Sequence, residues 1–290
     1  MVFKKILVAF GYGEDAEEIV QQAKYIAYCH QAKLVFVHVV EPLLLMGIPE
    51  AYGYYEMLRS DEEAKVEEMA RMDKIIHRMG VERDSVKKIV RFGSIKNEII
   101  DCAKVEGADL IFVGAHEKRL SGFYLGSIAN AVLHQSTVNV LVTKTSDNDK
   151  SPAIKPYKRI LIAIEFMPEI DKVINQAKEL AEKHEAELTM VHVVNRAPVF
   201  EMPLSLFEIE IVEKVERQFE QLAQDYGLAG APSQLLLGSP GKEIVDYAKK
   251  EAIDLIVMGS HGRHGAGLLL GSTANSVFHR SHCDVLAVRL

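Results

Sequence analysis

The chain lacks the features that mark a membrane protein, a disulfide-stabilised protein or a nucleic-acid-binding protein. No apolar run reaches the roughly 18 residues that a membrane-spanning helix needs, and the first ten residues predict a strand rather than a signal sequence. Its three cysteines, Cys29, Cys102 and Cys283, form no Cys-x-x-Cys pair, so we expect reduced thiols in the cytoplasm. Lys and Arg number 34 against 41 Asp and Glu, with no basic tract to follow a nucleic-acid backbone. Neither a membrane nor a nucleic acid is therefore expected as a partner.

What the chain does contain is an internal repeat. Residues 93–144 align without a gap on residues 238–289, and the residues that match include Gly93/Gly238, Asp109/Asp254, Gly114/Gly259, His116/His261, Gly126/Gly271 and Asn130/Asn275. The two beginnings also match, Lys-Lys-Ile-Leu-Val-Ala at 4–9 and Lys-Arg-Ile-Leu-Ile-Ala at 158–163. The sequence therefore predicts two homologous domains, 1–145 and 157–290, joined by a polar, proline-containing linker over 146–156.

Within each half, short runs rich in β-branched residues alternate with longer segments of helical periodicity. The predicted strands are 6–10, 34–40, 86–91, 110–113 and 138–143, then 160–164, 188–194, 234–237, 255–258 and 285–288. The predicted helices are 14–31, 60–79, 95–106 and 127–136, then 169–184, 205–226, 240–251 and 272–281. This alternation predicts an α/β fold in each half: a doubly wound, Rossmann-like parallel sheet with helices on both faces.

The helix over 60–79 carries its own signals. Ser60-Asp-Glu-Glu63 is typical of a capping box at a helix start. Val66, Met69, Ile76 and Met79 recur at helical intervals, and we expect them to belong to the core rather than to a binding site.

A glycine-rich stretch, Gly259 to Asn275, follows the predicted fourth strand of the second half. In a doubly wound sheet, ligands bind at the carboxyl ends of the strands, where the winding direction reverses. Gly259, Gly262 and Gly265 leave room for backbone N–H groups to approach an anion, and Arg263 adds positive charge. Gly271, Ser272 and Thr273 stand where the last helix begins. This chemistry suits the binding of a phosphate. The alternative is that the stretch is only a tight turn leading to a capped helix, with no ligand.

Three segments of the second half together resemble the universal stress protein family. They are Leu-Leu-Leu-Gly-Ser-Pro-Gly-Lys-Glu-Ile at 235–244, Asp-Leu-Ile-Val-Met-Gly-Ser-His-Gly-Arg-His-Gly at 254–265, and Cys-Asp-Val-Leu-Ala-Val-Arg at 283–289. The first half is similar to the same family, so the resemblance covers nearly the whole chain as a tandem of two such domains. It implies five parallel strands in the order 3-2-1-4-5 and pairing of fifth strands between domains. A further homodimer is compatible with it.

The same resemblance implies ATP or AMP, with or without Mg²⁺, held between the ends of strands one and four of the second half. Eight residues separate Gly262 from Gly271, one fewer than in the family's nucleotide-binding pattern. The residues that it places around the nucleotide are Glu165, Val193, Val194, Gly259, Ser260, His261, Gly262, Arg263, Gly265, Gly271, Ser272 and Thr273. In the first half Gly11 stands in place of Glu165, and Glu117 in place of Gly262. A carboxylate within a phosphate site repels its ligand, so we interpret the first site as degenerate.

Three other interpretations remain open. His261-x-x-His264 and His279-x-x-His282-Cys283 have the spacing of zinc ligands, although surface and structural histidines are the expectation. No arrangement of catalytic residues is recognisable, but slow ATP hydrolysis or phosphorylation of Ser272 or Thr273 is compatible with the sequence. The Tyr-rich segment 41–55 could cover the first site, contact a protein or bind a small apolar ligand, in which case the chain acts without a nucleotide.

Overall fold

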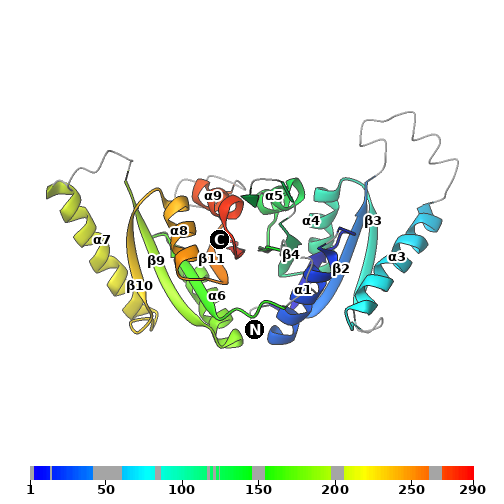
Figure 1. Ribbon diagram of the computed structural model, residues 1–290, viewed down its shortest axis with the longest axis horizontal. Coiled ribbons are helices and arrows are strands. Elements are labelled where there is room, and N and C mark those ends of the chain that lie inside the picture. Colours follow the sequence, from blue (N-terminus) through cyan, green and yellow to red (C-terminus); the bar gives the residue numbers. More distant parts are fainter. Residues whose placement is uncertain are drawn as a thin grey trace. The chain divides into compact units, whose positions relative to one another are not determined.

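The computed structural model describes residues 3–13, 15–41, 61–81, 86–115, 118–119, 122–123, 125–145, 154–196, 206–260 and 270–290. The chain divides into two compact units, Met1–Lys155 and Pro156–Leu290. Each unit contains five parallel strands with helices beside them (Figure 1). Within the described residues, no helix has the length and apolar character needed to cross a membrane. Ser60, the first residue of the predicted capping box, lies outside the described residues.

The first unit has the strand order β3-β2-β1-β4-β7, with every pair parallel. Helices α1 and α3 contact one another, and α4 and α5 contact one another. The elements are β1 (Lys5–Ala9), α1 (Ala16–His30), β2 (Lys33–Val40), α3 (Asp61–Arg78), β3 (Lys87–Phe92), α4 (Ile95–Glu106), β4 (Leu110–Gly114), α5 (Ser127–Gln135) and β7 (Asn139–Thr143). A short antiparallel pair, β5 (Lys118–Arg119) with β6 (Gly122–Phe123), precedes α5.

The second unit repeats this order as β10-β9-β8-β11-β12, again with parallel pairs. Its elements are β8 (Arg159–Ile164), α6 (Ile170–His184), β9 (Glu187–Asn195), α7 (Leu206–Asp225), β10 (Ser233–Gly238), α8 (Pro240–Lys250), β11 (Leu255–Gly259), α9 (Ser272–Arg280) and β12 (Asp284–Val288). Helices α8 and α9 pack together, while α6 and α7 both contact β9. The predicted fold and the order 3-2-1-4-5 are therefore confirmed in both units. Pairing between the two fifth strands stays a prediction.

Residue patterns explain these elements. The central strands β4, β8 and β11 are buried along almost their whole length, as expected for strands covered on both faces. Helix α6 buries the residues of one face, namely Ile170, Val173, Ile174, Ala177, Leu180, Ala181 and His184.

The prediction for one residue of α3 was wrong. Val66 is 68% exposed, whereas Ala64, Met72 and Ile76 are buried. Since residues in a helix are about 100° apart, positions 64, 72 and 76 share a face and Val66 points away from it. Met69 and Met79 are half-buried.

In each unit, one aspartate directly before the fourth strand has a structural role. Asp109 accepts a hydrogen bond from the backbone N–H of Lys4 at 2.8 Å, and Asp254 accepts from Lys158 at 2.7 Å and Arg159 at 2.9 Å. Each carboxylate therefore holds the start of the first strand of its unit.

Candidate functional site

The candidate site of the second unit lies where the winding of its sheet reverses. Strand β8 pairs with β9 on one side and with β11 on the other. The chain continues from β8 to β9 through α6, and from β11 to β12 through α9, so the two crossovers leave in opposite directions. Such a switch point opens a crevice at the carboxyl ends of the two strands. Glu165 directly follows β8, and Gly259 ends β11.

The two ends of the glycine-rich stretch meet at this edge. The backbone N–H of Gly271 donates to the carbonyl oxygen of Ser260 at 3.0 Å, and the N–H of Ser260 donates to Val288 at 3.0 Å. Ser260 is 1% exposed. The stretch therefore leaves β11 and returns to the same point before α9 begins. His261, Gly262, Arg263, Gly265 and His264 lie outside the described residues.

Among the described residues, no side chain caps the start of helix α9 at this point. Gly271 is its N-cap and has no side chain that could accept from the first amides, and the first turn contains no acidic residue. The N–H groups and the helix dipole at such a start favour a negative charge. Ser272 and Thr273 are the first two residues of α9, so their hydroxyls belong to the same helix start. Ser272 is exposed and Thr273 is half-buried.

A histidine whose role the sequence did not reveal holds the end of β8. The Nδ1–H of His192 donates to the carbonyl oxygen of Ile164 at 2.8 Å, and its ring contacts that of Phe166, with centroids 4.7 Å apart. Because Ile164 and Phe166 flank Glu165, these contacts position the half-buried Glu165. The sequence Val-His-Val-Val occurs at 37–40 and again at 191–194, and this repeat was the available signal. The role of the histidine is shown only by its contact with the neighbouring strand.

Val193 and Val194 lie on β9 next to this histidine. They pair in register with Leu236 and Leu237 of β10; Val193 is buried and Val194 is half-buried. The structure therefore brings Glu165, Gly259, Ser260, Gly271, Ser272 and Thr273 to adjacent strand ends and one helix start, and places the two valines on the strand beside Glu165.

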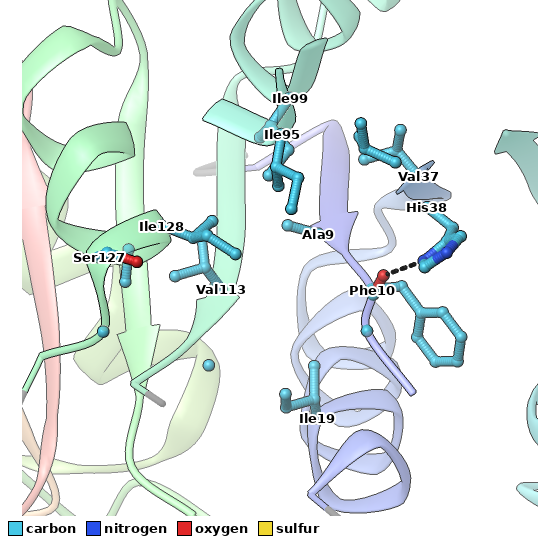
Figure 2. Close-up of a pocket in the computed structure, with 15 residues that line it drawn as sticks. Ala9, Phe10, Ile19, Val37, His38, Ile95, Ile99, Val113, Ser127 and Ile128 are labelled. Atoms are coloured by element: carbon cyan, nitrogen blue, oxygen red, sulfur yellow. Dashed lines mark hydrogen bonds between the residues drawn. The ribbon is translucent and has the colours of Figure 1, made fainter. Parts of the chain in front are cut away.

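The first unit has a cavity of about 380 Å³ at the corresponding place. Figure 2 shows Ile95 and Ile99 on one side of it, Ile19 opposite them, and Val113 and Ile128 facing Ala9 and Phe10 across the space. Among the fifteen described residues that line the cavity, the polar side chains are those of His38 and Ser127. The aliphatic ones, apart from alanine, are Ile19, Val37, Val39, Ile95, Ile99, Val113 and Ile128.

His38, the histidine among the described lining residues, repeats the contact seen in the second unit. The Nδ1–H of His38 donates to the carbonyl oxygen of Phe10 at 2.9 Å, and its Nε2 lies 3.8 Å from Glu68. Tyr12 stacks on His38 with ring centroids 4.2 Å apart, and Arg71 lies over the Tyr12 ring. The imidazole is thus held by its neighbours in the protein.

The metal interpretation receives no support from the described part of the chain, where no group of three His, Cys, Asp or Glu residues could hold a metal ion. His279 donates from Nδ1 to the carbonyl oxygen of Asn275, one helical turn earlier, at 2.8 Å. The thiol of Cys283 lies 3.3 Å from the Ser281 hydroxyl. These contacts are those of a helix end and the turn after it. The other candidate pair, His261 and His264, lies outside the described residues.

The chain thus consists of two doubly wound α/β units in tandem. In each unit the candidate site lies at the strand ends where the winding of the sheet reverses. Comparison with known families matches the universal stress protein family over residues 2–144 and again over residues 156–289. The chain therefore belongs to the universal stress protein family and contains two of its domains.

Individual relatives agree with this assignment. Universal stress protein A homolog 2 of Coxiella burnetii is 34% identical over 140 residues, which are 46% of this chain and 96% of that protein. A putative universal stress protein of Pseudomonas aeruginosa covers 99% of this chain and 93% of its own, with a TM-score of 0.71 and 20% identity. The match to a universal stress protein of Archaeoglobus fulgidus covers 100% of this chain and 97% of that protein, with a TM-score of 0.66 and 22% identity. The two solved structures support the fold across both units.

Proposed function

We propose that this chain is a regulatory binding protein whose second unit binds an adenine nucleotide, ATP or AMP. The observation that carries the proposal is the bond from Gly271 N–H to the carbonyl oxygen of Ser260. It closes the glycine-rich stretch and brings the start of α9 to the end of β11. An anion placed there meets backbone N–H groups and a favourable helix dipole.

The neighbouring residues supply the other two parts of a nucleotide site. Glu165, fixed between the residues that His192 contacts, offers a carboxylate that can accept hydrogen bonds from ribose hydroxyls. Val193 and Val194 lie on the adjacent strand β9. Since successive side chains of a strand point to opposite faces of the sheet, one of the two would provide an apolar contact for the adenine ring. Nucleotide pockets combine such apolar contacts with a few placed polar groups.

The test is calorimetric titration of the full chain with ATP and with AMP, together with mass spectrometry of any ligand released from the purified protein. Gly262→Glu introduces the residue that the first half has at that position, and we expect it to lower ATP affinity at least tenfold through charge repulsion. Thr273→Ile, which copies Ile128, should weaken binding less. Gly230→Glu is the matched control, because Gly230 is exposed and a Cβ atom there meets no atom of the described residues within 4 Å. Equal ATP affinity in wild type and Gly262→Glu, or binding in neither, would contradict the proposal.

A further inference from the structure

The cavity of the first unit differs in chemistry from the corresponding place in the second. At the end of the first strand, Gly11 stands where the second unit has Glu165, and a Cβ atom built at Gly11 meets no atom of the described residues within 4 Å. Contact with these residues therefore does not require a glycine at this position. The space that a side chain would occupy belongs to the cavity, which Gly11 lines.

The start of helix α5 is also less polar than the start of the corresponding helix α9. Ile128, in the first turn of α5, occupies the position of Thr273 in α9. Its side chain is 39% exposed and lines the cavity. A branched aliphatic residue at a helix start offers a ligand no hydrogen bond, and its exposed surface gains free energy only when something apolar covers it.

A negative charge lies near the point where a phosphate would enter. The Asp15 carboxylate would be 3.3 Å from a Cβ atom built at Gly114, the last residue of β4. A carboxylate beside this strand end disfavours a phosphate group bound there. Together with the aliphatic lining, this makes the cavity unfavourable for a nucleotide, whose polar edges and charges would lose their water without compensation.

We propose that the cavity of the first unit is a binding site for an uncharged, mainly apolar small molecule. Its volume of about 380 Å³ falls within the range of about 300–1,000 Å³ that is typical of ligand pockets. Burial of the ligand against Ile95, Ile99 and Ile128 provides the affinity, since apolar area removed from water is the main favourable contribution. This site is independent of the nucleotide site proposed for the second unit.

The experiment titrates the full chain with N-phenyl-1-naphthylamine, an uncharged dye whose fluorescence rises in apolar surroundings. We expect saturable binding to the wild type, and a dissociation constant raised at least tenfold in Gly11→Glu, whose carboxylate would enter the cavity. Gly230→Glu adds the same charge at an open glycine of the second unit and should bind the dye like the wild type. Saturating ATP should leave the dye bound.

A second variant protects the test against misfolding of Gly11→Glu, with circular dichroism to establish that each variant is folded. Ile128→Glu places an acid in the first turn of α5, where the helix dipole favours it, and it too should weaken dye binding at least fivefold. Absence of saturable binding to the wild type overturns the proposal. So does unchanged affinity in both cavity variants, and so does displacement of the dye by ATP.

Discussion

Acidification should destabilise the second unit through one buried histidine. His184, the last residue of α6, is 3% exposed and packs on the Tyr157 ring, with centroids 5.1 Å apart. Burial is the main cause that lowers its pKa from 6.5 to about 4, and the nearby positive charge of Lys158 acts in the same direction. The folded unit therefore keeps this imidazole neutral over a range where the unfolded chain protonates it.

The direction and size of the effect follow from proton linkage. Between the folded pKa and the unfolded pKa, the unfolded state binds more protons, so stability falls as the pH falls. The contribution is fully present above pH 6.5 and is lost as the pH falls toward about 4. With these values, we expect His184 to account for a loss of about 2 kcal/mol in the free energy of unfolding between about pH 7 and about pH 5.

Urea denaturation followed by circular dichroism at these two pH values measures the effect. Other groups also titrate in this range, so the informative quantity is the difference in pH dependence between wild type and His184→Phe, which keeps a ring against Tyr157. His77→Gln is the control, because His77 is exposed on α3. The reasoning fails if wild type and His184→Phe lose the same stability over this interval.

Two further predictions concern single glycines and the thiols. Gly238 has φ of +145°, and a Cβ atom there would lie 2.9 Å from Glu243. Gly238→Ala should therefore lower the free energy of unfolding by about 1–3 kcal/mol, while Gly230→Ala should leave it nearly unchanged. Equal urea midpoints for the two variants would refute this prediction. Burial raises the pKa of Cys283 to about 12 and also raises that of the buried Cys102. Only the half-buried Cys29 should then react with a thiol reagent such as DTNB before the protein unfolds, and Cys29→Ser should abolish this reaction. Equal reaction rates for all three cysteines would contradict the prediction, because they would show the thiols to be similarly accessible.

The sequence predicts most of the fold because local periodicity and the internal repeat point to the same elements. Helix α4 begins and ends where the pattern places it, Ile95–Glu106. The prediction fails where periodicity alone is ambiguous. Val66 matches a helical interval, yet the face of α3 that packs is set by Ala64, Met72 and Ile76. The short β5–β6 pair has no clear signal because each strand is only two residues long.

The candidate sites are harder to predict because they depend on distances between segments far apart in the sequence. Gly259, Gly271 and Glu165 can be chosen from the repeat and the resemblance, but the bond between Gly271 and Ser260 appears only in the folded chain. The ring of His192 could be placed on a strand from its neighbours. Its bond to Ile164, on the adjacent strand, could not. The apolar cavity likewise needs side chains from several helices and strands at once.

The two copies of the site separate what the fold requires from what a ligand requires. A Cβ atom at Gly114 would lie 2.5 Å from Cδ1 of Ile19, and Ile19 is buried. A side chain at this position would require Ile19 to move, so packing within the first unit favours a glycine here whatever the site binds. The shared Gly114 and Gly259 are therefore weak evidence for a common ligand. Gly11 is the opposite case, since a Cβ atom there meets no atom of the described residues within 4 Å. The difference between Gly11 and Glu165 is therefore not dictated by this packing, and it is the position at which the two proposed sites differ most in charge.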